Sequence, residues 1–117
     1  MIILPLPPVG INHAYLPRKT KKSGYYRKRE LKDWEDECLW LLKKKKVKPV
    51  KIQESGNLCV NLCFYYENNR IDIDSRIKFV LDVLERSGLY ANDRQITDLI
   101  VAKRIVKEEP RVEIEVY

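Results

Sequence analysis

The pattern of apolar and polar residues predicts four β-strands, two of them from strict alternation. Every second residue is apolar in the stretch 58–66, and three apolar residues alternate with two glutamates in 112–116. Successive side chains of an extended backbone point to opposite faces, so each stretch has one apolar face. A short apolar run at 2–4 ends at prolines and predicts an opening strand. The β-branched stretch 96–106 predicts the remaining strand.

Apolar residues at steps of three and four predict two amphipathic helices. The first spans about residues 27–46, and its apolar stripe consists of Leu31, Trp34, Cys38, Leu41 and Leu42. The second spans about residues 75–87, with Asp72 or Asp74 available as its N-cap. We therefore predict an α+β fold, in which residues 1–117 form a single compact domain. A mixed or antiparallel sheet of about four strands packs with the two helices.

The composition fits one cytoplasmic domain. The chain has 117 residues, and its apolar content of 44% is enough to bury a core without disulfide support. The three cysteines, Cys38, Cys59 and Cys63, fit no closed disulfide framework and no zinc-ligand spacing, so we expect reduced thiols. No apolar run approaches the ~20 residues that cross a bilayer. We expect a cytoplasmic protein without membrane contact.

Positive charge predicts a polyanionic partner. Lys and Arg number 23 against 17 Asp and Glu, which gives a formal net charge of +6. Cations are concentrated in residues 18–32, where Tyr25 and Tyr26 lie between them. Because cations bind phosphates and aromatic rings stack on unpaired bases, phosphate contact is favoured over a solvated charge run. The lysines at 43–46 either complement the helix dipole or bind a phosphate backbone, and both uses stay open.

A pair of acids in the stretch 69–78 indicates metal chemistry. Asp72 and Asp74 are separated by one residue, so an extended chain points both carboxylates to the same side. Two like charges this close repel each other unless a cation lies between them. Lys78 follows Asp74 by four residues. It is either the partner in a surface ion pair or a cation that assists at a scissile phosphate.

A third acid is needed because magnesium takes oxygen ligands, and Asp93 is the candidate. A helix over 75–87 runs about 18 Å away from the acid pair, and the residues 88–93 span at most roughly 20 Å. The return requires an extended loop, a short or tilted helix, or a partner subunit that completes the site. Asp82 is expected to be solvated. Acids that hold magnesium at a phosphodiester predict hydrolytic strand cleavage.

Short motifs recur in order along nearly the whole chain. They are Leu4-Pro5-Leu6-Pro7-Pro8, Asn12, Tyr15, Arg70-Ile71-Asp72-Ile73-Asp74, Lys78, Asp82, Gly88, Asn92-Asp93 and Gln95-Ile96. With these motifs the chain resembles the RusA family of Holliday junction resolvases. The resemblance implies a homodimer that cuts four-way junction DNA symmetrically with Mg²⁺, for which Mn²⁺ substitutes. By motif position it implies that Asp72, Asp74 and Asp93 are catalytic metal ligands and that Lys78 is the essential lysine.

We therefore expect a dimeric, nucleoid-associated, magnesium-dependent junction resolvase. The residues expected to contact DNA are Asn12, Tyr15, Arg18, Lys19, Lys21, Lys22, Arg27, Lys28, Arg70, Arg76 and Lys103. Ser75 stands where many relatives carry asparagine, and Asn92 stands where some carry a further aspartate, so one-metal and two-metal chemistry both stay open. Two other functions also stay open: a non-catalytic protein that binds junctions or branched DNA, and a nuclease for other branched DNA.

Overall fold

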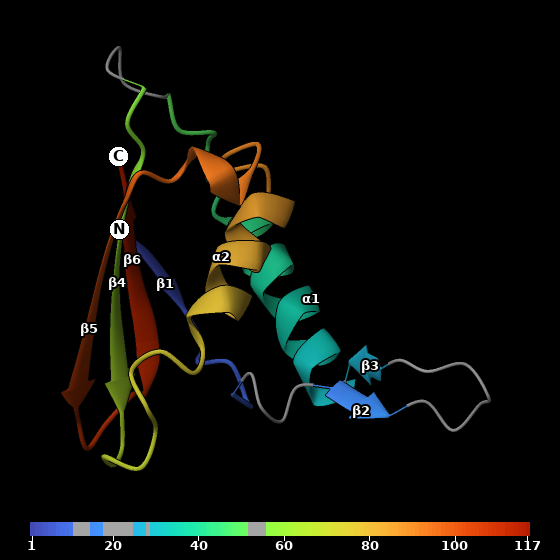
Figure 1. Ribbon diagram of the computed structural model, residues 1–117, viewed down its shortest axis with the longest axis vertical. Helices are drawn as coiled ribbons and strands as arrows, with labels where there is room; N and C mark the ends of the chain where they lie inside the picture. Colours follow the sequence, from blue (N-terminus) through green and yellow to red (C-terminus); the bar gives the residue numbers. More distant parts are fainter. Residues whose placement is uncertain (11–14, 18–24, 28, 52–55) are drawn as a thin grey trace.

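The elements follow one another in the order that the sequence pattern predicts, with a small two-stranded sheet added near the start (Figure 1). The computed structural model describes residues 1–10, 15–17, 25–27, 29–51 and 56–117. The elements are β1 (Ile2–Leu4), β2 (Tyr15–Pro17), β3 (Tyr25–Arg27), α1 (Arg29–Lys44), β4 (Cys59–Tyr66), α2 (Ile77–Arg86), the 3-10 helix η2 (Asp93–Gln95), β5 (Asp98–Ile105) and β6 (Arg111–Val116).

The main sheet is mixed, as predicted, and has the strand order β1-β6-β4-β5. β6 pairs antiparallel with both β1 and β4, whereas β4 and β5 run parallel, with Cys59 opposite Asp98 and Tyr66 opposite Ile105. Parallel neighbours cannot be joined by a tight turn and need a crossover, which α2 provides. Figure 1 shows α1 and α2 on the same side of this sheet. The chain is therefore a single α+β domain with its helices on one face of the sheet.

The core lies between that face and the two helices. Burial alternates along β4, whose side chains Val60, Leu62, Phe64 and Tyr66 are buried. Against them pack the apolar stripes of the helices: Leu31, Trp34, Cys38 and Leu42 from α1, and Phe79, Val80, Val83 and Leu84 from α2. Each fully buried side chain of this size contributes about 1.5–3 kcal/mol. The apolar stripes therefore fix both helices on the sheet.

Both helices are shorter than the sequence pattern predicts. The prediction that the first helix begins near Arg27 is wrong, because Arg27 belongs to β3 and pairs with Tyr15 of β2. α1 begins at Arg29. Within the described part of the chain, neither helix is both long and apolar enough to cross a membrane. The three cysteines are free, as expected, and burial raises the pKa of Cys38 to about 12.

The acid pair does not cap α2, so the predicted N-cap is wrong. The N-cap is Arg76, and its side chain makes no capping hydrogen bond. Instead, the backbone carbonyl of Asp72 accepts hydrogen bonds from the amide and the hydroxyl of Ser75, at 3.2 and 3.0 Å. These bonds close a turn before the helix begins. The carboxylates of Asp72 and Asp74 are thus not used as caps.

An ion pair connects the two helices at the edge of the core. Glu35 of α1 is only 4% exposed, and its carboxylate accepts a hydrogen bond from the guanidinium of Arg86 at 2.8 Å. The Arg86 side chain is about half exposed. A charge-assisted hydrogen bond to a buried carboxylate is stronger than one between neutral groups.

We expect Arg86→Ala to lower the free energy of unfolding by about 1–3 kcal/mol, because the buried carboxylate of Glu35 loses this hydrogen bond. The midpoint of urea unfolding measures the change. Lys32→Ala removes an exposed cation from α1 and serves as the control, with an expected change within about 0.5 kcal/mol. Equal midpoints for the two variants would contradict a stabilising role for the ion pair.

Candidate active site

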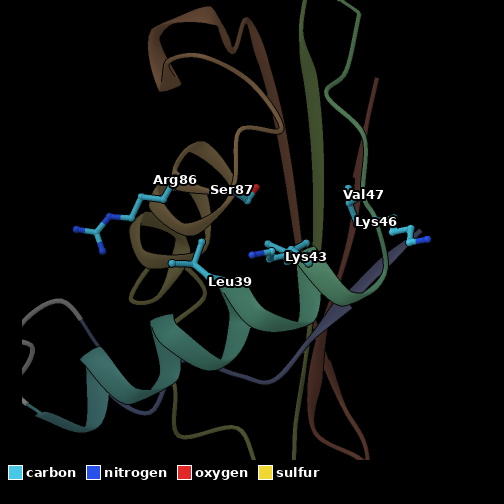
Figure 2. Close-up of a pocket in the computed structure, with 7 residues that line it drawn as sticks. Leu39, Lys43, Lys46, Val47, Arg86 and Ser87 are labelled. Carbon is cyan, nitrogen blue, oxygen red and sulfur yellow. The ribbon is translucent and has the colours of Figure 1, made fainter.

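The hollow between the carboxyl-terminal ends of α1 and α2 offers no carboxylate to a metal ion. It has a volume of about 470 Å³ and is lined by Leu39, Leu42, Lys43, Lys46, Val47, Arg86 and Ser87. Figure 2 shows the Arg86 side chain leading away from Lys43. None of these residues is acidic. The candidate metal ligands lie elsewhere, in the turn before α2, along α2 and in the segment after it.

The chain returns along α2 after Arg86 and brings Asp93 back to the helix. Gly88 permits the reversal, because its φ of +82° lies in the left-handed region that favours glycine. The hydroxyl of the buried Tyr90 then donates to the carbonyl of Leu81 at 2.7 Å. The backbone amide of Asp93 donates to the Glu85 carboxylate at 3.2 Å. The chain thus brings Asp93 back to α2, beside a helix shorter than predicted, and the predicted return of Asp93 to the Asp72 and Asp74 pair stays a prediction.

The segment around Asp93 is also fixed by its own hydrogen bonds. The Asn92 side chain accepts from the amide of Arg94 at 2.9 Å, and the Gln95 side chain accepts from the amide of Asn92 at 3.2 Å. Together they form a capping box at the start of η2. Asn92 therefore has a structural role that an aspartate could share, since either residue caps a helix.

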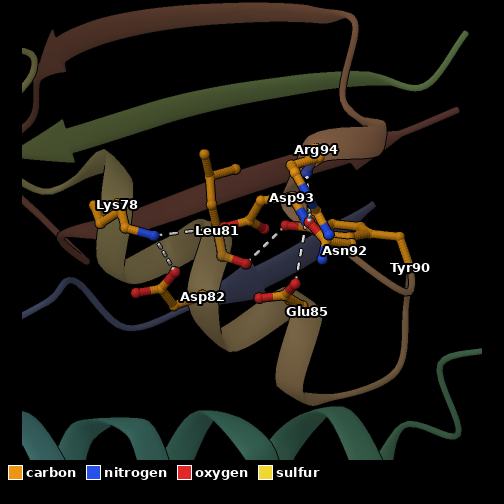
Figure 3. Close-up of polar contacts among 8 residues, drawn as sticks. All are labelled: Lys78, Leu81, Asp82, Glu85, Tyr90, Asn92, Asp93 and Arg94. Atoms are coloured by element: carbon orange, nitrogen blue, oxygen red, sulfur yellow. Dashed lines mark hydrogen bonds and ion pairs between the residues drawn. The ribbon is translucent and has the colours of Figure 1, made fainter.

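Three carboxylates gather at this point (Figure 3). Asp82, Glu85 and Asp93 each offer one oxygen, and these oxygens lie within 4.8 Å of one another. Lys78, one turn before Asp82, places its ammonium 2.7 Å from the Asp82 carboxylate and 3.7 Å from that of Asp93. Three carboxylates and one ammonium leave a formal charge of −2. This charge and these oxygen donors suit a hard divalent cation.

The electrostatics of the cluster disfavour a charged Asp93. Burial raises the pKa of Asp93, a hydrogen bond with Tyr90 opposes the rise, and the negative charges of Glu85 and Asp82 add to it. One carboxylate oxygen of Asp93, Oδ1, is buried without a hydrogen-bond partner in the described part of the chain. Asp82 raises the pKa of Lys78, so the lysine is protonated at neutral pH. A bound cation would relieve the repulsion at Asp93.

Asp72 and Asp74 belong to a different hollow. They are exposed and line a hollow of about 900 Å³ together with Lys103 and Arg104 of β5. The Lys103 ammonium donates to the carbonyl of Ile71 at 2.9 Å and so ties the turn to the sheet. The described acids within 4.8 Å of one another include Asp93 but neither Asp72 nor Asp74. The assignment of all three as ligands of one metal stays a prediction.

The structure brings Lys78 and Asp93 together, but changes the partners expected around them. Asp82 was expected to be solvated, and this is wrong, because its side chain is 18% exposed and accepts from Lys78. Asp74 precedes the first residue of α2, so the four-residue spacing to Lys78 creates no helical pair. The sequence reasoning missed Glu85. The steps of four and three from Lys78 to Asp82 and Glu85 place all three on one helix face, which was the available signal.

The residues expected to contact DNA fall into three groups. Around the acid turn, Arg70 is exposed, Lys103 is bound to the turn, and the Arg76 guanidinium lies 5.7 Å from the ring centre of Tyr66. Tyr15 and Arg27 pair through the backbone of β2 and β3. The others lie outside the described residues: Asn12, Arg18, Lys19, Lys21, Lys22 and Lys28. For all of them, DNA contact stays a prediction.

Comparison with known families identifies the kind of protein that carries this cluster. The model of the family described as Endodeoxyribonuclease RusA matches residues 5–117. The chain belongs to the RusA endodeoxyribonuclease family. This confirms the resemblance noted from the motifs and places the chain in a family of Holliday junction nucleases. Among curated proteins, no match is found. The match to RusA includes the acid turn, α2 and the segment that carries Asp93.

We expect Asp93→Asn to raise the melting temperature by a few degrees when divalent ions are absent. The raised pKa means that ionised Asp93 weakens the fold, so stability falls as pH rises through that pKa, and the neutral amide of the variant avoids this loss. The advantage of the variant should grow from acidic to neutral pH. Thermal unfolding in EDTA across this pH range measures it, with the exposed Asp33→Asn on α1 as the control.

Magnesium should reverse this order. At a concentration a hundredfold above Kd, a bound ion stabilises the wild type by about 2.7 kcal/mol, and Asp93→Asn should lose most of this gain. A wild type that is more stable than Asp93→Asn in EDTA, or an equal magnesium effect on both proteins, would contradict the proposed electrostatics.

Proposed function

We propose that this RusA family member is a magnesium-dependent endonuclease that resolves four-way DNA junctions by paired symmetric nicks. The observation that carries the proposal is the contact between the Lys78 ammonium and the Asp93 carboxylate at 3.7 Å. Most of α2 and the reversal of the chain after it separate these two residues in the sequence. The match of the family model to residues 5–117 supports the substrate. The charge of −2 around the contact supports a divalent cofactor.

Asp72, Asp74 and Asp93 are the proposed ligands of Mg²⁺. Mn²⁺ is expected to substitute for Mg²⁺ as the cofactor. The ion would supply a hydroxide nucleophile and polarise the phosphoryl oxygens. In support, all three side chains are carboxylates, and Asp93 has a buried oxygen without a protein partner in the described chain. Glu85 is a positioning residue in this proposal, because it holds the backbone of Asp93.

Lys78 is proposed to act on the phosphate directly. Its side chain is 62% exposed, so the ammonium can contact a DNA strand without leaving α2. Because Asp82 raises its pKa, the lysine carries its positive charge at neutral pH. A fixed cation at this place stabilises the negative charge that develops on the phosphate and the leaving oxygen. Asp82 keeps the ammonium in position through the 2.7 Å contact.

The proposed path of the DNA passes over the acid turn. The hollow of about 900 Å³ beside Asp72 and Asp74 is open and carries Lys103 and Arg104 on its β5 wall. These cations, with the exposed Arg70, can bind the phosphates that flank the cleaved bond. We include the cations of residues 18–28 among the DNA contacts on the strength of their composition. A junction has two equivalent strands, so we propose a homodimer with one site for each strand.

One observation favours a second function, a junction-binding protein without catalysis. Asp72 and Asp74 lie outside the acid group around Asp93, and the pairing of Lys78 with Asp82 by itself would stabilise α2. In that case the basic surface would bind junctions tightly and no strand would be cut. Binding assays cannot separate the two functions, because both depend on phosphate contacts. Metal-dependent cleavage separates them.

We expect the wild type to place paired symmetric nicks in a synthetic four-way junction when Mg²⁺ is present and none in EDTA. Asp74→Asn should lose about 100-fold or more in nicking rate, because it removes a proposed metal ligand. Lys78→Ala should lose about 10²–10³-fold, because it removes the charge that stabilises the transition state. Strand-specific end labels on denaturing gels measure both rates.

Asp33→Asn is the matched control for the first variant, since it neutralises an exposed acid on α1 that is not a proposed metal ligand. Flap and linear duplex competitors test whether another branched DNA is the preferred substrate. Tight binding without nicks, or full activity in Asp74→Asn, would contradict the proposed nuclease mechanism.

A further inference from the structure

The carboxyl-terminal end of α1 carries a concentrated positive charge that the proposed site does not use. Six lysines lie here without an intervening acid: Lys43, Lys44, Lys45, Lys46, Lys48 and Lys51. We call these residues the lysine segment. Their combined formal charge equals the formal net charge of +6 of the whole chain. All six are exposed, and none forms an ion pair with an acid of the described residues.

The helix dipole accounts for only part of this charge. Lys43 and Lys44 lie in the last turn of α1, where cations complement the partial negative charge of the helix end. The effect falls off within that turn, and the other four lysines follow it. The exposed acids of α1, Glu30, Asp33, Asp36 and Glu37, all lie in its first nine residues. The helix therefore repels a polyanion along its start and attracts one only at its end.

Lys46 occupies a backbone conformation that favours glycine. Its φ is +52°, in the left-handed region. The amide of Val47 bonds to the carbonyl of Leu42 at 3.2 Å, and that of Lys46 to Lys43 at 3.1 Å, the two bonds of a Schellman motif. Glycine is the usual residue at this position because a side chain is strained there. Lys46 is exposed, so its side chain extends the positive charge of the last turn beyond the helix.

An exposed aromatic ring lies beside the lysines. Trp40 is 58% exposed, whereas Trp34, two turns earlier on α1, is buried and donates to the Pro5 carbonyl at 2.8 Å. The Lys44 ammonium lies 4.8 Å from the centre of the Trp40 ring. A flat ring with cations around it can contact both the phosphates and the bases or sugars of a nucleic acid. The hollow beside Lys43 and Lys46 continues this surface toward α2 (Figure 2).

The lysine segment lies at the other end of the sheet from the acid turn (Figure 1). The backbone amide of Val50 donates to the carbonyl of Leu89. Val47 and Val50 also border the end of β6. At that end, the backbone of Tyr117 is hydrogen-bonded to the start of β4. The acid turn follows the end of β4. β4 has eight residues, so the two places are about 26 Å apart along the strand, close to the length of eight base pairs of duplex.

We propose that the lysine segment and Trp40 form a second DNA-binding surface, which holds the phosphate backbone of a duplex arm away from the cleaved bond. The proposal rests on the proposed function for the identity of the polyanion. An anionic membrane would also attract lysines, but the four exposed acids in the first nine residues of α1 would face such a surface if the helix lay on it. A duplex arm can contact the end of the helix alone.

Salt dependence of junction binding tests the proposal. Lys45→Gln/Lys48→Gln removes two charges after the helix, and Lys107→Gln removes an exposed charge outside the lysine segment and outside the predicted phosphate contacts. Each lost phosphate contact lowers the slope of log K against log salt by about 0.9. We expect the first variant to lose a slope of about two and the second to keep the wild-type slope. Fluorescence anisotropy with Mg²⁺ replaced by Ca²⁺ measures both.

A second pair of variants separates charge from folding. Lys46→Gly and Glu109→Gly each remove the backbone strain of a left-handed residue, since the φ of Glu109 is +51°. Both variants should therefore raise the melting temperature by a few degrees. Only Lys46→Gly should weaken junction binding. Equal binding by the two glycine variants, or equal salt slopes for Lys45→Gln/Lys48→Gln and Lys107→Gln, would overturn the proposal.

Binding to vesicles that contain phosphatidylserine completes the test. The proposal would also be overturned if Lys45→Gln/Lys48→Gln weakened binding to the vesicles but not binding to DNA. Failure of the proposed function has a different signature. In that case the wild type would not nick a junction with Mg²⁺, whatever the salt slopes are. If the second surface alone is wrong, nicking persists and the slopes of Lys45→Gln/Lys48→Gln and Lys107→Gln both equal that of the wild type.

Discussion

The parallel pairing of β4 with β5 is the constraint on which the rest of the structure depends. It forces the chain to cross from one end of the sheet to the other between these strands, and α2 is that crossover. The acid turn must therefore lie at one end of α2 and the segment with Asp93 at the other. Residues that connect the acid turn with the segment of Asp93 must therefore lie along α2. Lys78, Asp82 and Glu85 occupy that face, and Tyr90 and Glu85 draw Asp93 back toward Lys78.

Of the described places that retain a local cost for folding, two lie in the proposed functional surfaces. At the acid cluster, burial and the neighbouring carboxylates raise the pKa of Asp93, so its charged form weakens the fold. At the end of α1, Lys46 has a left-handed backbone that glycine would adopt with less strain. Costs of this kind persist at functional sites, where the strained or repelled group has another use. Both places belong to the proposed contacts with metal and DNA.

The charge of the chain is arranged in distinct regions. Acids are concentrated around Asp93 and in the first nine residues of α1, whereas cations lie on the β5 wall of the acid hollow and after α1. The distance between the two basic regions, about the length of β4, exceeds the Debye length of roughly 8–10 Å at physiological salt. Each region therefore attracts phosphates independently. A duplex long enough to reach both would gain from both, which would orient an arm relative to the cleavage site.

The sequence by itself determined the four strands of the main sheet, the two helices and the inward faces of β4, α1 and α2. Period-two alternation in residues 58–66 and period-three-and-four spacing in α1 and α2 depend on neighbours a few residues apart, and the structure confirms them. Local pattern also placed two acids in the turn before α2. Tertiary structure decided the strand order, the parallel register of β4 and β5, and the pairing of β2 with β3, because these contacts join residues that periodicity does not relate. For the same reason only the folded chain placed Asp82 and Glu85 beside Asp93 and left Asp72 and Asp74 in a separate hollow.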